Sequence, residues 1–223
     1  GRIRQLLDRY LSTLLPPFFG ALVDYTREYR YSWHTPGHMG GVAFQKSPAG
    51  SEFYRFFGEG TLRADLSASV PELGSLLEHS GVVGAAEDHA AAVFGADRTL
   101  FVTNGTSGAN AIVWSAMVGP GDRVLVDRNC HKSVVHAMIT TGAVPVYLRP
   151  QRNAYGIIGP VPETEFERVR VLEGLTHPAS TGQGEKSPFR LAILTNSTYD
   201  GLCYHTGKVR ELLTGLVPAI HYD

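Results

Sequence analysis

The chain carries its clearest structural signal in RVLVDRNCHKSVVHAMITTGAVPVYL, residues 123–148. Two short apolar runs, at 123–126 and 144–148, enclose a stretch at 133–141 with the composition and length of a helix. Two strands joined through a helix are typical of parallel neighbours in one sheet. This segment therefore predicts an α/β fold.

The same alternation continues on both sides of this segment. Strand-like runs lie at 99–103, 191–195 and 219–222, and helix-like stretches lie at 107–117 and 207–216. Strands that alternate with helices imply a mainly parallel sheet with helices on both faces. The polar, glycine-rich residues 176–187 are predicted to form a surface loop.

The N-terminal part of the chain has a different character. Residues 1–30 carry apolar residues at helical spacing, and Pro16 and Pro17 interrupt this pattern. Residues 31–50 are rich in glycine and proline and too irregular for a strand or a helix. We therefore expect a helical N-terminal arm ahead of the α/β part of the chain.

The composition is that of an ordinary globular protein, with 43% hydrophobic and 18% charged residues. Lys and Arg number 20 and Asp and Glu 21, so the formal net charge is −1. A balanced chain has no bulk electrostatic reason to bind nucleic acid or an anionic membrane. No apolar run approaches the roughly 20 residues that span a bilayer. We expect neither nucleic acid nor a membrane as a partner.

The two cysteines, Cys130 and Cys203, lie far apart and form no CxxC pair. A disulfide framework and a thiolate metal site are therefore not expected, and a reducing cytoplasm is the predicted compartment. His34 and His38 have the four-residue spacing of metal ligands on a helix, but the proline and glycine between them break a helix. We interpret HTPGH as a backbone turn and predict no metal site.

Polar residues follow the predicted strands, where open α/β sheets bind their ligands. The first group is NGTSGAN, residues 104–110. Glycines and hydroxyls at a helix start can form a phosphate-binding cup, or Thr106 or Ser107 can simply cap the helix. The motif also approaches the nucleophile elbow GxSxG, with Ala109 in place of the second glycine. A serine hydrolase with Ser107 as nucleophile and His221 or His205 as the base is thus an alternative.

Two further strand ends carry side chains that could bind a ligand or take part in a reaction. His131 follows the strand-like run at 123–126 and could stack on a flat ring, whereas an isolated histidine is more often structural. Lys132 beside it is more often a solvated cation than a Schiff-base lysine. Asp223 follows the run at 219–222 and could cap a helix or pair with a protonated ring nitrogen.

Several motifs in one order give the chain a resemblance to a known family. They are YRFFGEG (54–60), DLSASVPELGSLLEHSG (65–81), NGTSGAN, DRNCHKS (127–133), RNAYGIIGP (152–160), TNSTYDG (195–201) and HYD (221–223). Together they resemble the bacterial Orn/Lys/Arg decarboxylases, pyridoxal-phosphate (PLP) enzymes of the aspartate-aminotransferase fold. The resemblance implies an N-terminal helical linker or arm at 1–45 and the first part of the PLP-binding large domain at 46–223.

The resemblance also implies roles for particular residues. Gly105, Thr106 and Ser107 would bind the cofactor phosphate, His131 would stack on the pyridine ring, and Asp223 would pair with the protonated ring nitrogen. Thr198 is a weaker candidate near the 3-oxygen of the ring. His131 and Asp223 are the predicted catalytic residues.

One element of the family pattern is missing. The Schiff-base lysine of the family lies in a Ser-x-His-Lys segment downstream of the aspartate, and none of Lys46, Lys132, Lys186 and Lys208 has that setting. We therefore expect a partial chain, truncated before that lysine and inactive by itself.

The intact enzyme would decarboxylate a basic amino acid, with lysine preferred over arginine and ornithine, and would assemble as a dimer or larger homo-oligomer. Asp65 and Glu72 are candidate contacts for the substrate amine, although solvated or capping carboxylates are the more common case. A non-catalytic phosphate-binding fragment is the remaining alternative.

Overall fold

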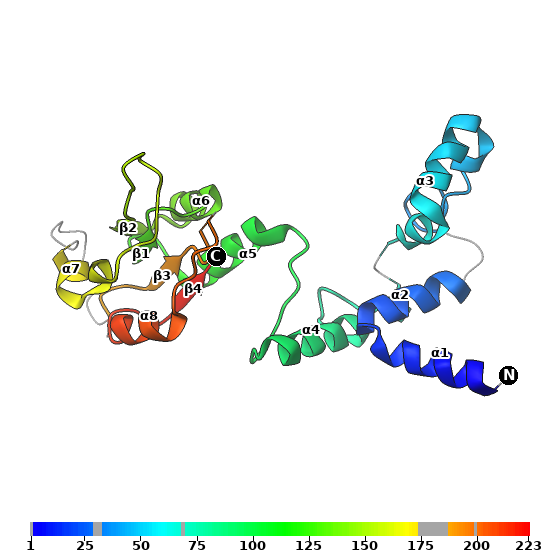
Figure 1. The fold of residues 1–223 in the computed structure, drawn as a ribbon, viewed down its shortest axis with the longest axis horizontal. Helices are drawn as coiled ribbons and strands as arrows, with labels where there is room; N and C mark the ends of the chain where they lie inside the picture. Colours follow the sequence, from blue (N-terminus) through cyan, green and yellow to red (C-terminus); the bar gives the residue numbers. More distant parts are fainter. Residues whose placement is uncertain (1, 29–32, 68–69, 174–186, 199) are drawn as a thin grey trace. The chain divides into compact units, whose positions relative to one another are not determined.

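The computed structural model describes residues 2–28, 33–67, 70–173, 187–198 and 200–223. The chain divides into two compact units, Gly1–Phe101 and Val102–Asp223 (Figure 1). This division does not coincide with the boundary expected after residue 45. Helix α2 (Pro17–Glu28) packs against both α3 (Pro48–Ala64) and α4 (Gly81–Phe94), so helices from either side of residue 45 share one unit.

The first unit is helical. Besides α2, α3 and α4 it contains α1 (Arg2–Leu14) and the short 3-10 helices η1 (Phe44–Lys46) and η2 (Pro71–Leu73). The predicted helical character of the N-terminal residues is confirmed over the part of 1–30 that the structure describes. Helix α1 ends at Leu14 and Pro17 begins α2, as expected because proline suits the first turn of a helix but not its interior.

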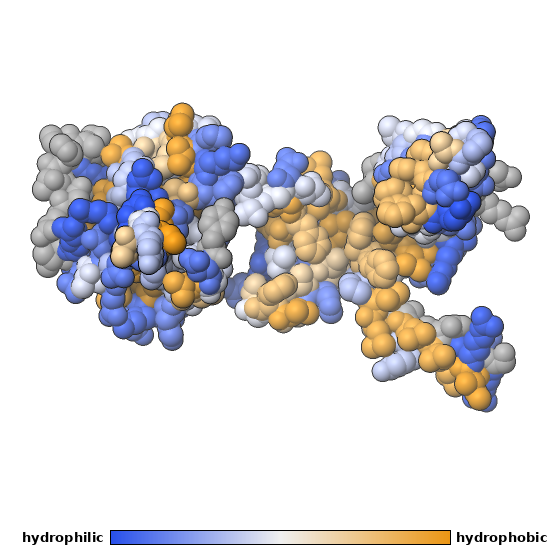
Figure 2. Space-filling view, turned by 45° about the horizontal axis from the view of Figure 1, so that its top comes forward, coloured by the Kyte–Doolittle hydropathy of each residue, from blue (hydrophilic) through white to orange (hydrophobic). Residues whose placement is uncertain are grey.

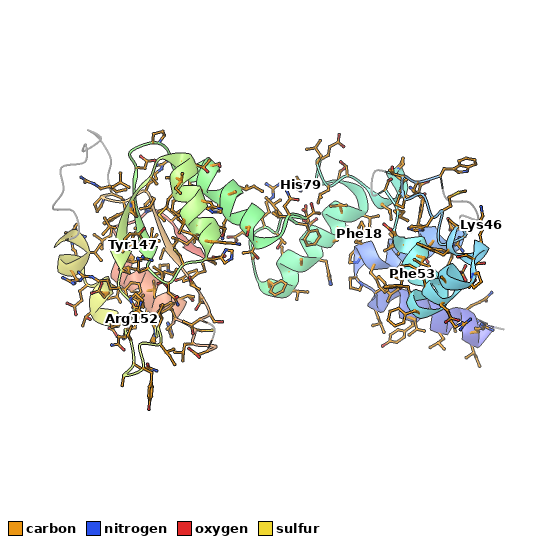
Figure 3. The ribbon with its side chains drawn as sticks, turned by 90° about the horizontal axis from the view of Figure 1, so that it is seen from above. Phe18, Lys46, Phe53, His79, Tyr147 and Arg152 are labelled. Atoms are coloured by element: carbon orange, nitrogen blue, oxygen red, sulfur yellow. The ribbon has the colours of Figure 1, made fainter. Side chains whose placement is uncertain are left out.

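Local contacts explain the irregular stretch before α3. His38 accepts a hydrogen bond from the Gly41 N–H at 3.0 Å through Nδ1, and its Nε2 lies 2.9 Å from the Asp65 carboxylate. HTPGH therefore forms a turn, as predicted. The side chain of Ser47 caps α3, and Phe53, labelled in Figure 3, packs its ring 4.5 Å from that of Phe44.

The second unit is a parallel α/β structure. Its sheet has the order β2-β1-β3-β4, in which all neighbouring strands are parallel. The strands are β1 (Arg123–Asp127), β2 (Val144–Leu148), β3 (Leu191–Leu194) and β4 (Ile220–Tyr222). The helices are α5 (Gly105–Met117), α6 (Lys132–Thr141), η3 (Glu163–Phe166), α7 (Arg168–Glu173) and α8 (Thr206–Leu213). The four strands and helices α5, α6 and α8 agree with predicted elements to within a few residues at each end, whereas η3 and α7 were not predicted.

Helices lie on both faces of the sheet, with α5 and α6 packed on one face and α7 and α8 on the other, which confirms the predicted arrangement (Figure 1). Because successive strand residues point to opposite faces, Val124 and Val126 join Trp114 of α5 in one core cluster. Leu125, between them, joins residues of α7 and α8 in the other. The loop predicted at 176–187 lies outside the described residues except for Ser187.

The strand predicted at 99–103 is not formed. The backbone N–H of Phe101 donates to the Glu87 carboxylate at 2.9 Å instead of to a neighbouring strand, and Leu100 and Phe101 are exposed. A strand needs a partner for its backbone groups, and the β-rich composition of this run does not supply one.

Candidate active site

A hollow of about 1000 Å³ lies in the second unit, at the carboxyl ends of the strands. The chain leaves β1 toward β2 on one side, whereas β3 and β4 lie on the other side, so the strand order reverses between β1 and β3. Open α/β sheets bind ligands at such a reversal, because loops from both sides diverge there. The lining residues are Asn104, Gly105, Thr106, Ser107, Asn129, Cys130, His131, Lys132, Thr195, Ser197, Thr198 and Asp223.

The start of α5 forms one wall of the hollow. Gly105 has a φ of 71°, a left-handed conformation that favours glycine, and it turns the chain into the helix. Asn104 precedes the helix without a side-chain hydrogen bond to it, and Thr106 and Ser107 are exposed. Because no side chain caps the helix start, this wall offers hydroxyls and the positive end of a helix dipole to an anion.

A second wall follows β1. Asp127 is buried, and its carboxylate accepts hydrogen bonds from the N–H groups of Asn129 at 2.8 Å and Thr195 at 3.4 Å. Burial raises the pKa of the Asp127 carboxyl, and the two backbone hydrogen bonds act in the opposite direction. Asp127 thereby holds the loops after β1 and β3 together below the hollow.

His131 stands at the start of α6 with its ring exposed. Its Nδ1 accepts a hydrogen bond from the Ser133 N–H at 3.2 Å and lies 2.8 Å from the Ser133 hydroxyl. The ring is therefore fixed through one nitrogen. Burial is the main reason why the pKa of the neighbouring Cys130 thiol is raised. This thiol therefore stays protonated at neutral pH.

Asp223 and Thr198 complete the hollow from β4 and β3. The Asp223 N–H donates to the Leu194 carbonyl, and the Asp223 carbonyl accepts from the Asn196 N–H, both at 2.9 Å. Its carboxylate Oδ1 accepts from Asn110 Nδ2 at 3.0 Å. Thr198 is buried, and its hydroxyl accepts the Leu202 N–H at 3.2 Å, which leaves its own proton to donate.

The structure thus brings the six predicted cofactor-site residues to one hollow: Gly105, Thr106, Ser107, His131, Thr198 and Asp223. The candidate substrate contacts Asp65 and Glu72 do not line it. Sequence reasoning missed Asn110 and Ser133, which lie behind the lining. A signal for Asn110 was present, because it is an amide in the otherwise apolar middle of NGTSGANAIVW.

The arrangement that a serine hydrolase requires is not present in the described part of the chain. Within the described ranges, no strand leads into α5, and neither His205 nor His221 lines the hollow or is hydrogen-bonded to Ser107. His205 instead caps α8 by accepting the Lys208 N–H at 3.1 Å. Burial lowers the pKa of His221, whose buried Nδ1 has no hydrogen-bond partner among the described residues.

Two further properties concern metals and membranes. Among the residues with described positions, no group of three or more His, Cys, Asp or Glu side chains could hold a metal ion. None of the helices in the described ranges is both long and apolar enough to span a bilayer.

The fold and the hollow define an open-sheet α/β protein with a candidate ligand site at a reversal of strand order. A family model described as Orn/Lys/Arg decarboxylase, major domain, matches residues 16–223, and the chain belongs to this family.

Curated relatives and a solved structure agree with this assignment. The chain is 56% identical over 222 residues to "Lysine decarboxylase LdcA" of Pseudomonas aeruginosa and 51% identical over 223 residues to "Lysine decarboxylase" of Hafnia alvei. Each match covers 100% of this chain and 29% of the relative. The solved structure of lysine decarboxylase A from Pseudomonas aeruginosa matches with a TM-score of 0.86 and 55% identity, over 100% of this chain and 30% of that one. The chain therefore spans less than a third of these relatives.

Proposed function

We propose that the protein carrying this chain is a pyridoxal-phosphate-dependent decarboxylase of a basic amino acid, and that this chain supplies part of the cofactor site. One observation carries the proposal: six residues predicted from separate motifs line a single hollow beyond the sheet. The family assignment and the names of the relatives support the same reaction class.

The start of α5 fits the phosphate end of this cofactor. A phosphate dianion needs several N–H or O–H donors and a positive local potential. The exposed hydroxyls of Thr106 and Ser107 and the uncapped start of a 13-residue helix supply both. Gly108 allows the first turn to approach Asn104, since a Cβ there would lie 2.8 Å from the Asn104 Cβ.

The opposite wall fits the ring end. The exposed imidazole of His131 is a flat group that can stack on a pyridine. The Asp223 carboxylate would hold a proton on the ring nitrogen, and the free proton of Thr198 would donate to the ring oxygen. At a separation of about 4 Å and an effective dielectric of 20, such an ion pair attracts by about 4 kcal/mol before desolvation is subtracted.

When bound, the cofactor supplies an electron sink for the electron pair that departing carbon dioxide leaves at Cα. The residues of this chain would prepare that step. Asp223 would keep the ring nitrogen protonated, and Thr106 and Ser107 would fix the cofactor against rotation. His131 would cover one face of the ring and exclude water from it.

We infer lysine as the preferred substrate, ahead of arginine and ornithine, because the relatives with 51–56% identity are named lysine decarboxylases. Asp65 pairs with His38, and Glu72 lies in η2; both belong to the first unit. Their proposed substrate contacts remain predictions.

The test is spectroscopic. The whole protein, mixed with pyridoxal phosphate, is expected to show a visible absorption band that borohydride bleaches, and to release carbon dioxide from L-lysine faster than from L-arginine or L-ornithine. This chain alone is expected to do neither. Absence of the band and of carbon dioxide release with all three substrates would reject the proposal. Phosphate binding without either would favour the non-catalytic alternative, and fluorophosphonate labelling of Ser107 would favour the hydrolase.

We also infer a cytoplasmic, self-associating protein. Cys130 and Cys203 are both free, which suits a reducing compartment. Helix α1 presents an exposed apolar face, with Ile3, Leu7 and Leu14 among its residues, which suits association with a second copy.

A further inference from the structure

We propose that Asn110 is a positioning residue of this site, which orients Asp223 directly and His131 through Ser133. The inference rests on the proposed function, because it assigns a role to a residue behind that same cofactor site. Asn110 lies on α5 and is 1% exposed. Solvent therefore cannot supply hydrogen-bond partners for its amide group.

A chain of short hydrogen bonds carries the argument. Asn110 Nδ2 donates to Asp223 Oδ1 at 3.0 Å and to Ser133 Oγ at 2.9 Å. Ser133 Oγ in turn lies 2.8 Å from His131 Nδ1. One buried amide thus links α5, the start of α6 and the end of β4, and it joins the two predicted catalytic residues.

The chemistry of the amide fixes which group donates and which accepts along this series of hydrogen bonds. An amide nitrogen only donates, so the Asp223 oxygen that faces it acts as an acceptor and the carboxylate is held in one orientation. The Ser133 hydroxyl, which accepts from Asn110, directs its own proton to His131 Nδ1. That nitrogen also accepts the Ser133 N–H at 3.2 Å, so the proton of the neutral ring lies on Nε2.

Burial separates this role from a stabilising one. Asn110 Oδ1 is buried and has no hydrogen-bond partner among the described residues. An unsatisfied buried carbonyl is unfavourable, and an apolar side chain of similar volume would avoid it. The amide is therefore better explained by what its nitrogen orients than by the stability that it adds.

The experiment compares five forms of the whole protein: the wild type, Asn110→Asp, Asn110→Leu, Ser133→Ala and the control Ser115→Ala. Ser115 is an exposed residue of the same helix. Four quantities are measured: the dissociation constant of pyridoxal phosphate, the pH dependence of the bound cofactor's absorption spectrum, kcat and KM for lysine, and the ¹⁵N shifts of His131 in cofactor-free protein. Thermal melting reports whether each variant folds.

Asn110→Asp replaces the donor with an oxygen that faces another carboxylate. We expect kcat to fall about tenfold or more, with a smaller change in KM, and the pH dependence of the spectrum to shift. Ser133→Ala is expected to mix the two imidazole tautomers of His131, with a smaller effect on the spectrum. Ser115→Ala is expected to match the wild type in every measurement.

The outcomes separate this inference from the proposed function. A wild type that shows the cofactor band and activity, with Asn110→Asp and Asn110→Leu equal to Ser115→Ala, overturns the inference alone. A wild type without cofactor band or activity overturns the proposed function and this inference with it. If the Asn110 variants do not fold, the Ser133→Ala variant tests the inference. Unchanged ¹⁵N shifts of His131 in that variant would reject the proposed orientation of His131 through Ser133.

Discussion

At the scale of single residues, three hydrogen bonds hold Asp223 in place in the hollow. Its backbone N–H donates to Leu194 of β3, and its backbone carbonyl accepts from Asn196, both at 2.9 Å. Asn110 donates to one oxygen of its carboxylate. Such a group loses little entropy when a ligand arrives, because its position is already fixed. A change of its charge without a change of its shape therefore tests its chemistry.

We predict that Asp223→Asn lowers kcat of the whole protein by about a hundredfold or more, because a neutral amide attracts a ring proton far less than a carboxylate does. The cofactor should still bind, since the hydroxyls of Thr106 and Ser107 are unchanged. Steady-state kinetics and a cofactor titration check this. Turnover near that of the wild type would contradict the assigned role.

At the scale of elements, the start of α5 depends on one backbone conformation. Gly105 has a φ of 71°, and a Cβ added there would meet no atom within 4 Å. A substitution is therefore unfavourable through backbone strain and not through a clash.

Gly105→Ala should destabilise the second unit by roughly 1 kcal/mol and weaken phosphate-end binding, because an L-residue is strained in this conformation. Gly119→Ala is the control, since its φ is not left-handed and its Cβ would make an ordinary 3.7 Å contact with Asp122. Denaturant unfolding and cofactor titration measure both effects. Equal stability of the two variants would refute the strain argument.

A second element depends on a buried carboxylate. Glu87 of α4 accepts the Phe101 N–H at 2.9 Å, and its carboxylate lies 2.9 Å from His79 Nδ1, the residue labelled in Figure 3. The hydrogen bond from the Phe101 N–H is the main cause that lowers the pKa of Glu87 below its ordinary value of 4.5. His79 lowers this pKa further, whereas burial acts in the opposite direction. A lowered pKa means that the unfolded chain binds more protons, so this stabilisation is present above pH 4.5 and is lost as the pH falls through the folded-state pKa.

We therefore predict that amide exchange at Phe101 accelerates as the pH falls below 4.5, beyond the intrinsic pH effect, and that Glu87→Gln removes this extra dependence. Glu52→Gln is the control, because Glu52 makes an exposed ion pair with Arg55. Hydrogen exchange followed by mass spectrometry is the measurement. An unaltered pH dependence in Glu87→Gln would show that another group is responsible.

At the scale of the whole molecule, self-association depends more on the distribution of apolar surface than on the net charge. Helix α1 has exposed apolar residues along its length, and Figure 2 shows apolar surface on this N-terminal helix. The formal net charge of −1 provides little long-range repulsion between copies. Both features favour the proposed self-association.

The double substitution Leu7→Glu with Leu14→Glu is predicted to lower the oligomeric mass of the whole protein, because it places charges on this apolar face. Gln5→Glu adds a charge to the same helix outside the run of apolar positions and should leave the mass unchanged. Sedimentation velocity distinguishes the two results. An unchanged mass in the double variant would exclude α1 as an association surface.

Most of the helices and strands of the second unit could be predicted from the sequence, and so could six residues that line its hollow. Periodicity, helix starts and the polar groups after each strand are local properties, so the strands at 123–127 and 144–148 and residues such as His131 and Asp223 could be predicted. The family resemblance rested on short motifs of the same local kind.

Tertiary structure alone decided the strand order, the absence of a strand at 99–103 and the place of Asn110 between Asp223 and Ser133. Each depends on which distant backbone or side chain supplies a partner. Asn110 and Asp223 lie 113 residues apart, and no local pattern encodes a hydrogen bond over such a separation. Partner choice follows from packing the whole sheet, which is why it lay beyond the sequence.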